Sequence, residues 1–353
     1  MSLKELRRKI DGVDKKILSL INQRVKVVSD ISRLKEKNKL GVFFPDREAG
    51  ILRKIKKLNK GPVENRDIEI IFGDVLSICR AVQTTLDIAY LGPEGTFTHL
   101  AAIKRFGKRS NFISCDNISE VFDAVSKNRA DYGVVPIENS IEGAVSYTLD
   151  VFIESNLKIC SEVALNISHS LLRVSIKSNL KRIYSNPQVF SQCRQWLLRE
   201  YPKVQLIPTA TTAQAAIMAK KDELSACIGN SMLAALYGIK EVRSHIEDSL
   251  SNVTRFLVVS HKDSSSTKKD KTSILFSVKD KVGALYGAIY SFKKYGINLT
   301  KIESRPSKKK PWEYYFFVDF EGHRKQERVK KALKALEKKC IFLKVLGSYP
   351  KEV

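Results

Sequence analysis

Cysteine and histidine are sparse in this chain of 353 residues, which has six of the first and five of the second. The cysteines never approach the Cys-x-x-Cys spacing of zinc sites, and the histidines are scattered singly. These spacings support neither a zinc site nor a disulfide framework. We therefore expect free thiols, no metal site and no cofactor.

Long apolar runs are missing as well. No stretch of about 18 apolar residues could span a bilayer, and the first residues, MSLKELRRKIDGVDKK, lack the apolar core of a signal peptide. At roughly 100 to 200 residues per domain, the length predicts two or three packed domains. The sequence therefore indicates a multidomain cytoplasmic protein without a membrane partner.

Positive charge dominates, with 62 Lys and Arg against 38 Asp and Glu and a net charge of +24. Residues 1–85 carry 20 basic and 11 acidic groups, residues 86–262 carry 20 and 17, and residues 263–353 carry 22 and 10. Total charge leaves nucleic acid, an acidic membrane and small anions open as partners. No helix-turn-helix pattern precedes the nearly neutral middle segment, so we expect small anionic substrates and no nucleic acid.

Domain boundaries follow from composition. The polar run HKDSSSTKKDKTS at 261–273 contains no apolar residue and predicts a linker. The other boundary falls near Leu86, where a helical pattern gives way to a strand pattern. We therefore predict domains at residues 1–85, 86–262 and 273–353, with the linker at 263–272.

The first segment carries the apolar seam of a long helix, which repeats by threes and fours over about four heptads and needs a partner to cover it. Its members are Leu3, Leu6, Ile10, Val13, Ile17, Leu20, Val27, Ile31 and Leu34. The seam is interrupted by Arg24. A guanidinium there costs several kcal/mol unless an anion meets it. The alternative to a binding role is a residue that sets the register or extends to solvent.

Helix geometry places two further cations. Lys35 follows Arg24 by 11 residues, which is three turns plus roughly 20°, so both lie on one face and could bind one ligand. Arg7 precedes Arg24 by 17 residues and lies about 100° away around the axis. A straight helix cannot direct both arginines into one pocket, so Arg7 is expected to serve a second site, for instance on a dimer partner.

Two further helical patterns follow. Arg47 and Glu48 begin the first, and Cys79 and Gln83 lie one turn apart on the second. With the motifs LRRKI, QR, LK and P-x-RE, this constellation resembles the all-α chorismate mutase domain of bifunctional enzymes, a three-helix fold that forms an intertwined dimer.

That resemblance implies roles for each residue. Arg7 of the partner chain, Arg24 and Arg47 would bind the two carboxylates of chorismate, and Glu48 its hydroxyl. The remaining members of the implied site are Lys35 and Gln83, which would meet the ether oxygen, and Cys79. Because the rearrangement to prephenate is a concerted pericyclic step, the protein needs only to hold the folded conformer and stabilise charge on the ether oxygen.

In the middle segment, polar residues follow strand patterns. A strand, a glycine-rich turn and a helix are predicted for IAYLGPEGTFTHLAA. A buried strand that ends in Glu138, Asn139 and Ser140 is predicted for ADYGVVPIENSIEGAV. A third strand, which ends in Ser185 with Gln192 downstream, is predicted for IYSNPQVFSQC. Ligands in open α/β sheets bind at such strand ends. Segments of this kind to about residue 260 predict two α/β lobes with a cleft between them.

SNVTRFLVVS adds Thr254, Arg255 and Phe256 at the start of an apolar strand. In this order and spacing the motifs resemble prephenate dehydratase, a two-lobed fold like that of periplasmic binding proteins, which converts prephenate to phenylpyruvate with loss of water and CO2. The resemblance implies that Thr254 donates a hydrogen bond to the departing hydroxyl, supported by Glu138 and Gln192. The other substrate contacts it implies are Asn139, Ser140, Ser185, Arg255 and Phe256. Arg255 alternatively ties the lobes together.

The last segment alternates as strand, helix, strand, strand, helix, strand, which predicts a ferredoxin-like α+β sandwich. GAL at 283–285 and ESRP at 303–306 resemble the ACT regulatory domain that binds L-phenylalanine at an interface between two copies. A homodimer is therefore the smallest assembly expected. The effector residues implied are Gly283, Ala284, Leu285, Asn298, Leu299, Glu303, Ser304, Arg305 and Pro306.

Several positions depart from the family patterns. Phe44 stands where many mutases have Asp and Cys79 where many have Ser, so a weakened or lost mutase site remains an alternative. Asn186 stands where dehydratases often have His, which excludes a histidine acid there, and His99 and His169 are interpreted as structural. Val282 stands where relatives commonly have Pro before the GAL motif, so the strength of feedback inhibition by L-phenylalanine is left open. A ligand-sensing binding protein is the alternative from another class.

Overall fold

The structure, a computed structural model, describes residues 2–37, 43–176, 178–249, 251–307 and 313–352. The chain forms two compact units, one of residues 1–86 with 106–111 and one of the remainder. Among the described residues, no helix combines the length and the apolar character that crossing a membrane requires.

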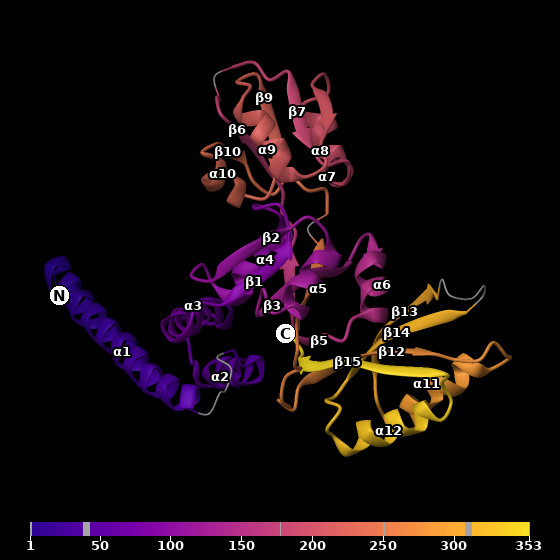
Figure 1. Ribbon diagram of the computed structural model, residues 1–353. Helices are drawn as coiled ribbons and strands as arrows, with labels where there is room; N and C mark the ends of the chain where they lie inside the picture. The colour runs from indigo at the N-terminus through magenta and orange to yellow at the C-terminus, as the bar shows by residue number, and fades with distance from the viewer. Residues whose placement is uncertain (1, 38–42, 177, 250, 308–312, 353) are drawn as a thin grey trace. The chain divides into compact units, whose positions relative to one another are not determined.

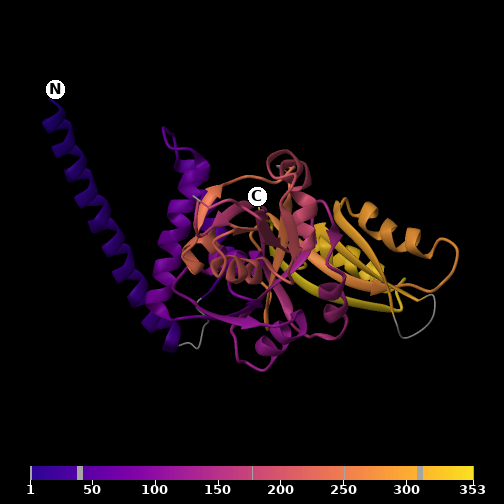
Figure 2. The ribbon, with the colours of Figure 1, turned by 90° about the horizontal axis from the view of Figure 1, so that it is seen from above.

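The first unit contains three helices, α1 (Leu3–Lys37), α2 (Pro45–Leu58) and α3 (Asn65–Gln83). Both views show α1 as one continuous helix (Figures 1 and 2). Pro45 starts α2 at a position where its missing N–H is not needed. The seam of α1 is exposed in the single chain, as at Ile10 (59%) and Leu20 (63%). The three predicted helices are confirmed, and the seam has the exposure expected of a helix that needs a partner.

The second unit begins with a lobe built on one mixed sheet, here called the first lobe. Its strand order is β2-β1-β3-β11-β5, with β4 added to β3. The strands are β1 (Asp87–Leu91), β2 (Asn111–Cys115), β3 (Tyr132–Asn139), β4 (Gly143–Ala144), β5 (Lys158–Asn166) and β11 (Val253–Ser260). The helices are α4 (Phe97–Phe106), α5 (Ile118–Ser126) and α6 (Ser146–Glu154).

The second lobe is inserted between β5 and β11, so the chain crosses between the lobes twice. Its sheet has the order β10-β6-β9-β7-β8. The strands are β6 (Ser170–Arg173), β7 (Arg182–Ser185), β8 (Gln205–Pro208), β9 (Ser225–Gly229) and β10 (Lys240–Arg243). The helices are α7 (Pro187–Gln192), α8 (Arg194–Glu200), α9 (Thr212–Lys220) and α10 (Met232–Tyr237). The predicted two-lobed α/β fold is confirmed.

The C-terminal domain is the predicted βαββαβ sandwich. Its elements are β12 (Asp270–Ser277), α11 (Ala284–Lys294), β13 (Leu299–Pro306), β14 (Tyr314–Glu321), α12 (Glu327–Glu337) and β15 (Phe342–Pro350). The antiparallel sheet has the order β13-β14-β12-β15. The two helices cover one face of this sheet (Figure 1), where Phe276, Phe292 and Phe320 form a core.

The other face of the C-terminal sheet packs on the first lobe. Leu275, Phe317 and Leu346 join a hydrophobic core that continues to β5 and α6. Gly347 of β15 lies close to the backbone of β5, because a Cβ there would lie 2.2 Å from the backbone oxygen of Ile159. Alternate residues of β12 thus serve two cores, as the period of a strand requires.

The stretch 263–272 differs from the expected linker. β12 begins inside it at Asp270, and Ser264 is buried with its hydroxyl donating to the Cys160 carbonyl at 2.6 Å. Polar composition favoured a linker, but short hydroxyl side chains satisfy buried backbone groups equally well. This segment is part of the contact between the first lobe and the C-terminal domain.

Candidate active sites

In the helical unit, one cluster of predicted residues assembles between α1 and α3. The guanidinium of Arg24 donates from Nη1 to Cys79 Sγ at 2.7 Å, and Gln83 donates from Nε2 to the Cys79 carbonyl at 3.1 Å. Arg24 is half-buried. The interruption of the seam therefore directs a cation toward the α3 residues that the sequence had singled out.

Glu48 of α2 lies against a cation that the sequence reasoning missed. Arg80 of α3 forms an ion pair with Glu48, and both side chains are about nine-tenths buried, with 8% and 10% exposed. A buried carboxylate requires such a partner. Arg80 directly follows Cys79 in the sequence. A charged residue next to a predicted site residue was the signal that could have identified it.

Two other predicted residues, Arg7 and Arg47, are not brought into this cluster by a single chain, and the side chain of a third, Lys35, is not described. Arg7 is exposed near the start of α1, and Arg47 is exposed on α2. At 1.5 Å per residue, Arg7 lies about 25 Å along the axis from Arg24. Lys35 lies near the end of α1, and its side chain is outside the described residues.

In the second unit, the ends of β3 and β11 lie side by side, with Thr254 opposite Asn139 in the antiparallel register. The Asn139 amide oxygen accepts from the backbone N–H of Ile141 (2.9 Å) and of Glu142 (3.1 Å), which fixes its orientation. Its Nδ2 then donates to Thr254 Oγ1 at 2.8 Å and to Asn252 Oδ1 at 2.7 Å. The amide group thereby holds the threonine side chain in place.

The Thr254 hydroxyl is arranged as a donor. It is half-buried and accepts from Asn139, and no acceptor for its own proton occurs among the described residues. A hydroxyl has one donor site and two acceptor sites. Thr254 can therefore donate a hydrogen bond to a ligand, which is what stabilising a departing oxygen requires.

A hydrogen-bonded chain joins the two lobes beside this threonine. Glu142, in the turn between β3 and β4, accepts from Gln192 Nε2 at 2.9 Å and from Gln188 Nε2 of α7. Gln192 Oε1 lies 2.7 Å from His169 Nε2, so the histidine donates there. Burial lowers the pKa of His169. Sequence reasoning missed Glu142, although an acidic residue only two positions after the ENS motif was a visible signal.

Comparison with known families finds three matches along the chain. The Chorismate mutase type II family matches residues 6–84, the Prephenate dehydratase family residues 88–264 and the ACT domain family residues 272–338. A bifunctional chorismate mutase/prephenate dehydratase of Aquifex aeolicus is 48% identical, covering 99% of this chain and 98% of the relative. The chain belongs to the bifunctional chorismate mutase/prephenate dehydratase family.

Two further comparisons agree. A bifunctional chorismate mutase/prephenate dehydratase of Pseudomonas aeruginosa is 44% identical over 99% of this chain and 98% of its own length. The crystal structure of a prephenate dehydratase from Arthrobacter aurescens in complex with L-Phe is 32% identical, with a TM-score of 0.71 over 75% of this chain and 90% of that one. The helical unit is thus the mutase domain, the two lobes form the dehydratase domain and the C-terminal domain is an ACT domain.

Several residues that were predicted to contact substrate in the dehydratase domain have partners within the protein. Ser185 is fully buried and donates to the Ile228 carbonyl at 2.7 Å, which ties β7 to β9. Phe256 is only 2% exposed and packs in the interior. Ser140 donates to the Ser251 carbonyl at 3.0 Å. Residues at a strand end have side chains on both faces, and the sequence does not show which face binds the ligand.

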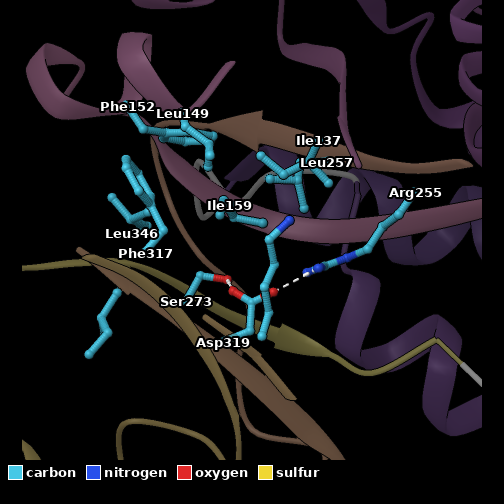
Figure 3. A pocket seen from close by; sticks show the side chains of 12 residues that line it. Ile137, Leu149, Phe152, Ile159, Arg255, Leu257, Ser273, Phe317, Asp319 and Leu346 are labelled. Carbon is cyan, nitrogen blue, oxygen red and sulfur yellow. Dashed lines mark hydrogen bonds and ion pairs between the residues drawn. The ribbon is translucent and has the colours of Figure 1, made fainter. Parts of the chain in front are cut away.

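Arg255 and Glu138 are also directed away from Thr254. Arg255 Nη1 lies 2.7 Å from Glu138 Oε1 and also 2.7 Å from Oδ2 of Asp319 in the ACT domain. Figure 3 shows Arg255 facing Asp319. Burial alone would lower the pKa of Arg255, but the charges of Tyr349, Asp319 and Glu162 raise it overall. Rather than contacting substrate or tying the lobes, Arg255 connects the dehydratase domain to the ACT domain.

Glu138 is an ion at neutral pH. Burial raises its pKa, but hydrogen bonds from Lys301 and Arg255 lower it by more, so the net pKa lies below the usual value. Because the pKa of Glu138 is lower in the folded than in the unfolded protein, the ionised carboxylate stabilises the fold at pH values above its unfolded-state pKa. This stabilisation of the fold is lost as the pH falls through the folded-state pKa. Glu138 therefore does not supply a proton near pH 7.

One departure from the family patterns, Asn186, has a local explanation, and His99 and the cysteines have the structural surroundings expected of them. Asn186 accepts from Gln188 N–H at 3.0 Å and donates to the Ala210 carbonyl at 2.8 Å, so it caps the short helix α7. His99 accepts from Gly95 N–H at 3.2 Å, and burial lowers its pKa. All six cysteines are free thiols, and burial raises the pKa of Cys160 to about 11.

The implied effector residues lie at the start of α11 and along β13. Gly283 caps α11 with φ of +76°, a conformation that favours glycine. Asn298 is exposed, and its carbonyl accepts from Glu321 N–H at 2.9 Å. Within ESRP, Arg305 donates to Ser146 Oγ at 2.9 Å and pairs with Asp150, so this motif contacts α6 of the dehydratase domain. The other implied effector residues, Ala284, Leu285, Leu299, Glu303, Ser304 and Pro306, lie on these same elements.

Proposed function

We propose that the chain catalyses two consecutive reactions, chorismate to prephenate in the mutase domain and prephenate to phenylpyruvate in the dehydratase domain. The observation that carries the second assignment is the hydrogen bond from Asn139 Nδ2 to Thr254 Oγ1. Because the threonine hydroxyl is the acceptor in this bond, its own proton remains available to the substrate. The first assignment is supported by the half-buried cation Arg24 at the α1–α3 contact.

In the mutase site, the chemistry requires placement and charge. Chorismate is a dianion, and a guanidinium fork matches a carboxylate. Arg24 and Arg47 would bind carboxylates, Lys35 and Gln83 would donate to the ether oxygen, and Glu48 would accept from the hydroxyl. No nucleophile or base takes part in the rearrangement. The rate acceleration therefore comes from binding chorismate in its folded conformation and from hydrogen-bond donors directed at the negative charge that develops on the ether oxygen.

In the dehydratase site, the ring carboxylate and the ring hydroxyl leave together. The bond from the ring to the carboxylate carbon breaks to release CO2, and its electron pair becomes part of the aromatic ring. The C–O bond breaks at the opposite ring carbon, and the departing oxygen takes one proton from solvent to leave as water. Thr254 donates the hydrogen bond that stabilises this oxygen, with Asn139 fixing its position.

Prephenate supplied alone at neutral pH separates this proposal from a ligand-sensing function. We expect the full-length protein to form phenylpyruvate and CO2 in equal amounts, measured by the absorbance of the enol of phenylpyruvate in base. A binding protein would retain prephenate without forming product. Binding without turnover would therefore contradict the dehydratase assignment, and turnover with no reaction of chorismate would show a lost mutase.

We further propose a homodimer in which Arg7 completes the mutase site of the partner. The support is the exposed seam of α1 and the separation of Arg7 from Arg24 along one helix. The protein would lie in the cytoplasm, where free thiols such as these six are the rule.

Complementation between inactive variants tests the shared site. Arg7→Ala and Arg24→Ala should each abolish most mutase activity, yet refolding an equal mixture should restore about a quarter of the wild-type rate, because half the dimers are mixed and each holds one intact site. The control mixture is Arg24→Ala with Gln83→Ala. Both residues contact Cys79 of one chain, so no intact site forms. Equal recovery in both mixtures, or in neither, would contradict the assignment of Arg7.

L-phenylalanine is proposed to inhibit the dehydratase through the ACT domain. Gly283→Ala should raise the inhibiting concentration roughly 10-fold, because it strains the left-handed start of α11. Gly287→Ala is the matched control, since that residue lies within α11 and an added Cβ would meet only the Lys339 side chain at 4.0 Å. The measurement is the dehydratase rate against phenylalanine concentration. Inhibition that is unchanged in both variants would place the effector site elsewhere.

A further inference from the structure

The catalytic strand β11 carries two consecutive residues with opposite orientations. Thr254 belongs to the proposed active site, and Arg255, the next residue, points to the opposite face as strand geometry requires. Arg255 is only 12% exposed and pairs with Glu162 and Glu138 within the dehydratase domain. It also pairs with Asp319 of β14 and donates to Tyr349 Oη of β15 at 2.9 Å. The residue next to Thr254 is therefore held by the ACT domain.

The neighbouring strand β3 is held in the same way. Asn139, which positions Thr254, follows Glu138, and Glu138 lies opposite Arg255 in the register. Glu138 Oε2 lies 2.5 Å from Lys301 Nζ, which is 12% exposed on β13 of the ACT domain. Thr254 and Asn139, the two partners of the hydrogen bond, thus each have a sequence neighbour that forms an ion pair with the ACT domain: Arg255 with Asp319, and Glu138 with Lys301.

The two ACT side chains lie opposite one another. Lys301 of β13 pairs with Asp319 of β14 in the strand register, next to an irregularity between Leu299 and Lys301. Leu299 is one of the implied effector residues, so the effector region and Lys301 are two residues apart on one strand. A displacement of this part of β13 would reach Glu138 directly.

The contact is closely packed and balanced in charge. Three cations, Arg255, Lys271 and Lys301, meet three anions, Glu138, Glu162 and Asp319, and five of the six side chains are at most 12% exposed. Removing one member leaves a buried charge without compensation. Figure 3 shows Arg255 and Asp319 facing one another beside a cavity of about 20 Å³, which is room for one water molecule.

We propose that Lys301 and Asp319 of the ACT domain are positioning residues of the dehydratase active site. Lys301 pairs with Glu138 and Asp319 pairs with Arg255, on the face of the sheet opposite the active site. These ion pairs keep the neighbouring residues Asn139 and Thr254 opposite one another, and they couple the start of β13 to the active site. This rests on the proposed dehydratase function. Neither residue touches the substrate, so their loss should affect turnover more than substrate binding.

The test uses the full-length protein with Asp319→Asn and Lys301→Met. Both should lower kcat for prephenate about 10- to 100-fold with KM changed less than about threefold, because misplacement of a reacting group costs this much. Both should also shift the phenylalanine concentration that gives half inhibition. Asp319→Glu and Lys301→Arg should recover most of kcat. Mutase activity in the same preparation should remain as in the wild type and reports that the rest of the chain is folded.

Asp263→Asn is the matched control. Asp263 is 11% exposed and pairs with Arg324 of the ACT domain at 2.9 Å, but it lies beyond Ser260, at the other end of β11 from Thr254. It should leave kcat unchanged. Wild-type kcat in Lys301→Met and Asp319→Asn, or an equal loss in Asp263→Asn, would overturn the proposal. If Asp319→Asn does not fold, Lys301→Met decides alone. A wild-type protein inactive on prephenate would instead contradict the proposed function.

Discussion

Thr254→Ala is expected to lower kcat for the conversion of prephenate by about 100-fold or more, because a positioned donor to a departing oxygen contributes this much. The mutase rate of the same protein should not change, since the mutase residues lie in a separate compact unit. The measurement is the initial rate on prephenate and on chorismate separately, for one preparation of the variant.

Thr254→Ser is the matched control for this variant. It keeps a hydroxyl that can accept from Asn139 and donate to substrate, so it should retain a large part of the activity. Asn139→Ala should fall between the two, because the hydroxyl remains but is no longer held. Full dehydratase activity in Thr254→Ala would contradict the role of this hydroxyl, and loss of both activities would show a structural role.

Arg24→Ala should lower the mutase kcat/KM by about 100-fold or more and leave the dehydratase unchanged. The guanidinium is the cation that interrupts the α1 seam, and it contacts Cys79 in the cluster. Arg24→Lys should recover only part of the rate, because a lysine lacks the planar fork that binds a carboxylate at two points. The measurement is chorismate consumption at several substrate concentrations.

Arg33→Ala is the control for Arg24→Ala, since Arg33 lies on the same helix, is 79% exposed and pairs only weakly with Asp30 at 3.4 Å. It should leave the mutase unaffected. Equal activity of Arg24→Ala and Arg33→Ala would show that Arg24 sets the helix register and does not bind substrate.

Local periodicity explains which features could be predicted from sequence. The α1 seam, the strand ends and the βαββαβ order each depend on spacing along the chain, and all three are present in the structure. Asn139 was found because it stands at a strand end, and Thr254 because the SNVTRFLVVS motif resembles that of prephenate dehydratase. Their mutual contact depends on β11 lying beside β3, which pairs residues 115 positions apart.

The side-chain partners that the motifs did not reveal depend on packing between domains. Arg255 and Glu138 belong to the same motifs as Thr254 and Asn139, yet their partners Asp319 and Lys301 lie in the ACT domain. Charge and motif membership do not show which face of a strand another domain covers. The expected linker differs for a related reason, because Ser264 is buried against the first lobe and Asp270 is buried at the start of β12.

A time course with chorismate as the only substrate tests the two-site assignment most directly. The full-length protein at neutral pH should consume chorismate, accumulate prephenate transiently and end with phenylpyruvate, each followed by chromatography. Prephenate that persists while chorismate disappears would contradict the assignment of the dehydratase site. Chorismate that persists, while added prephenate is still converted, would contradict the assignment of the mutase site.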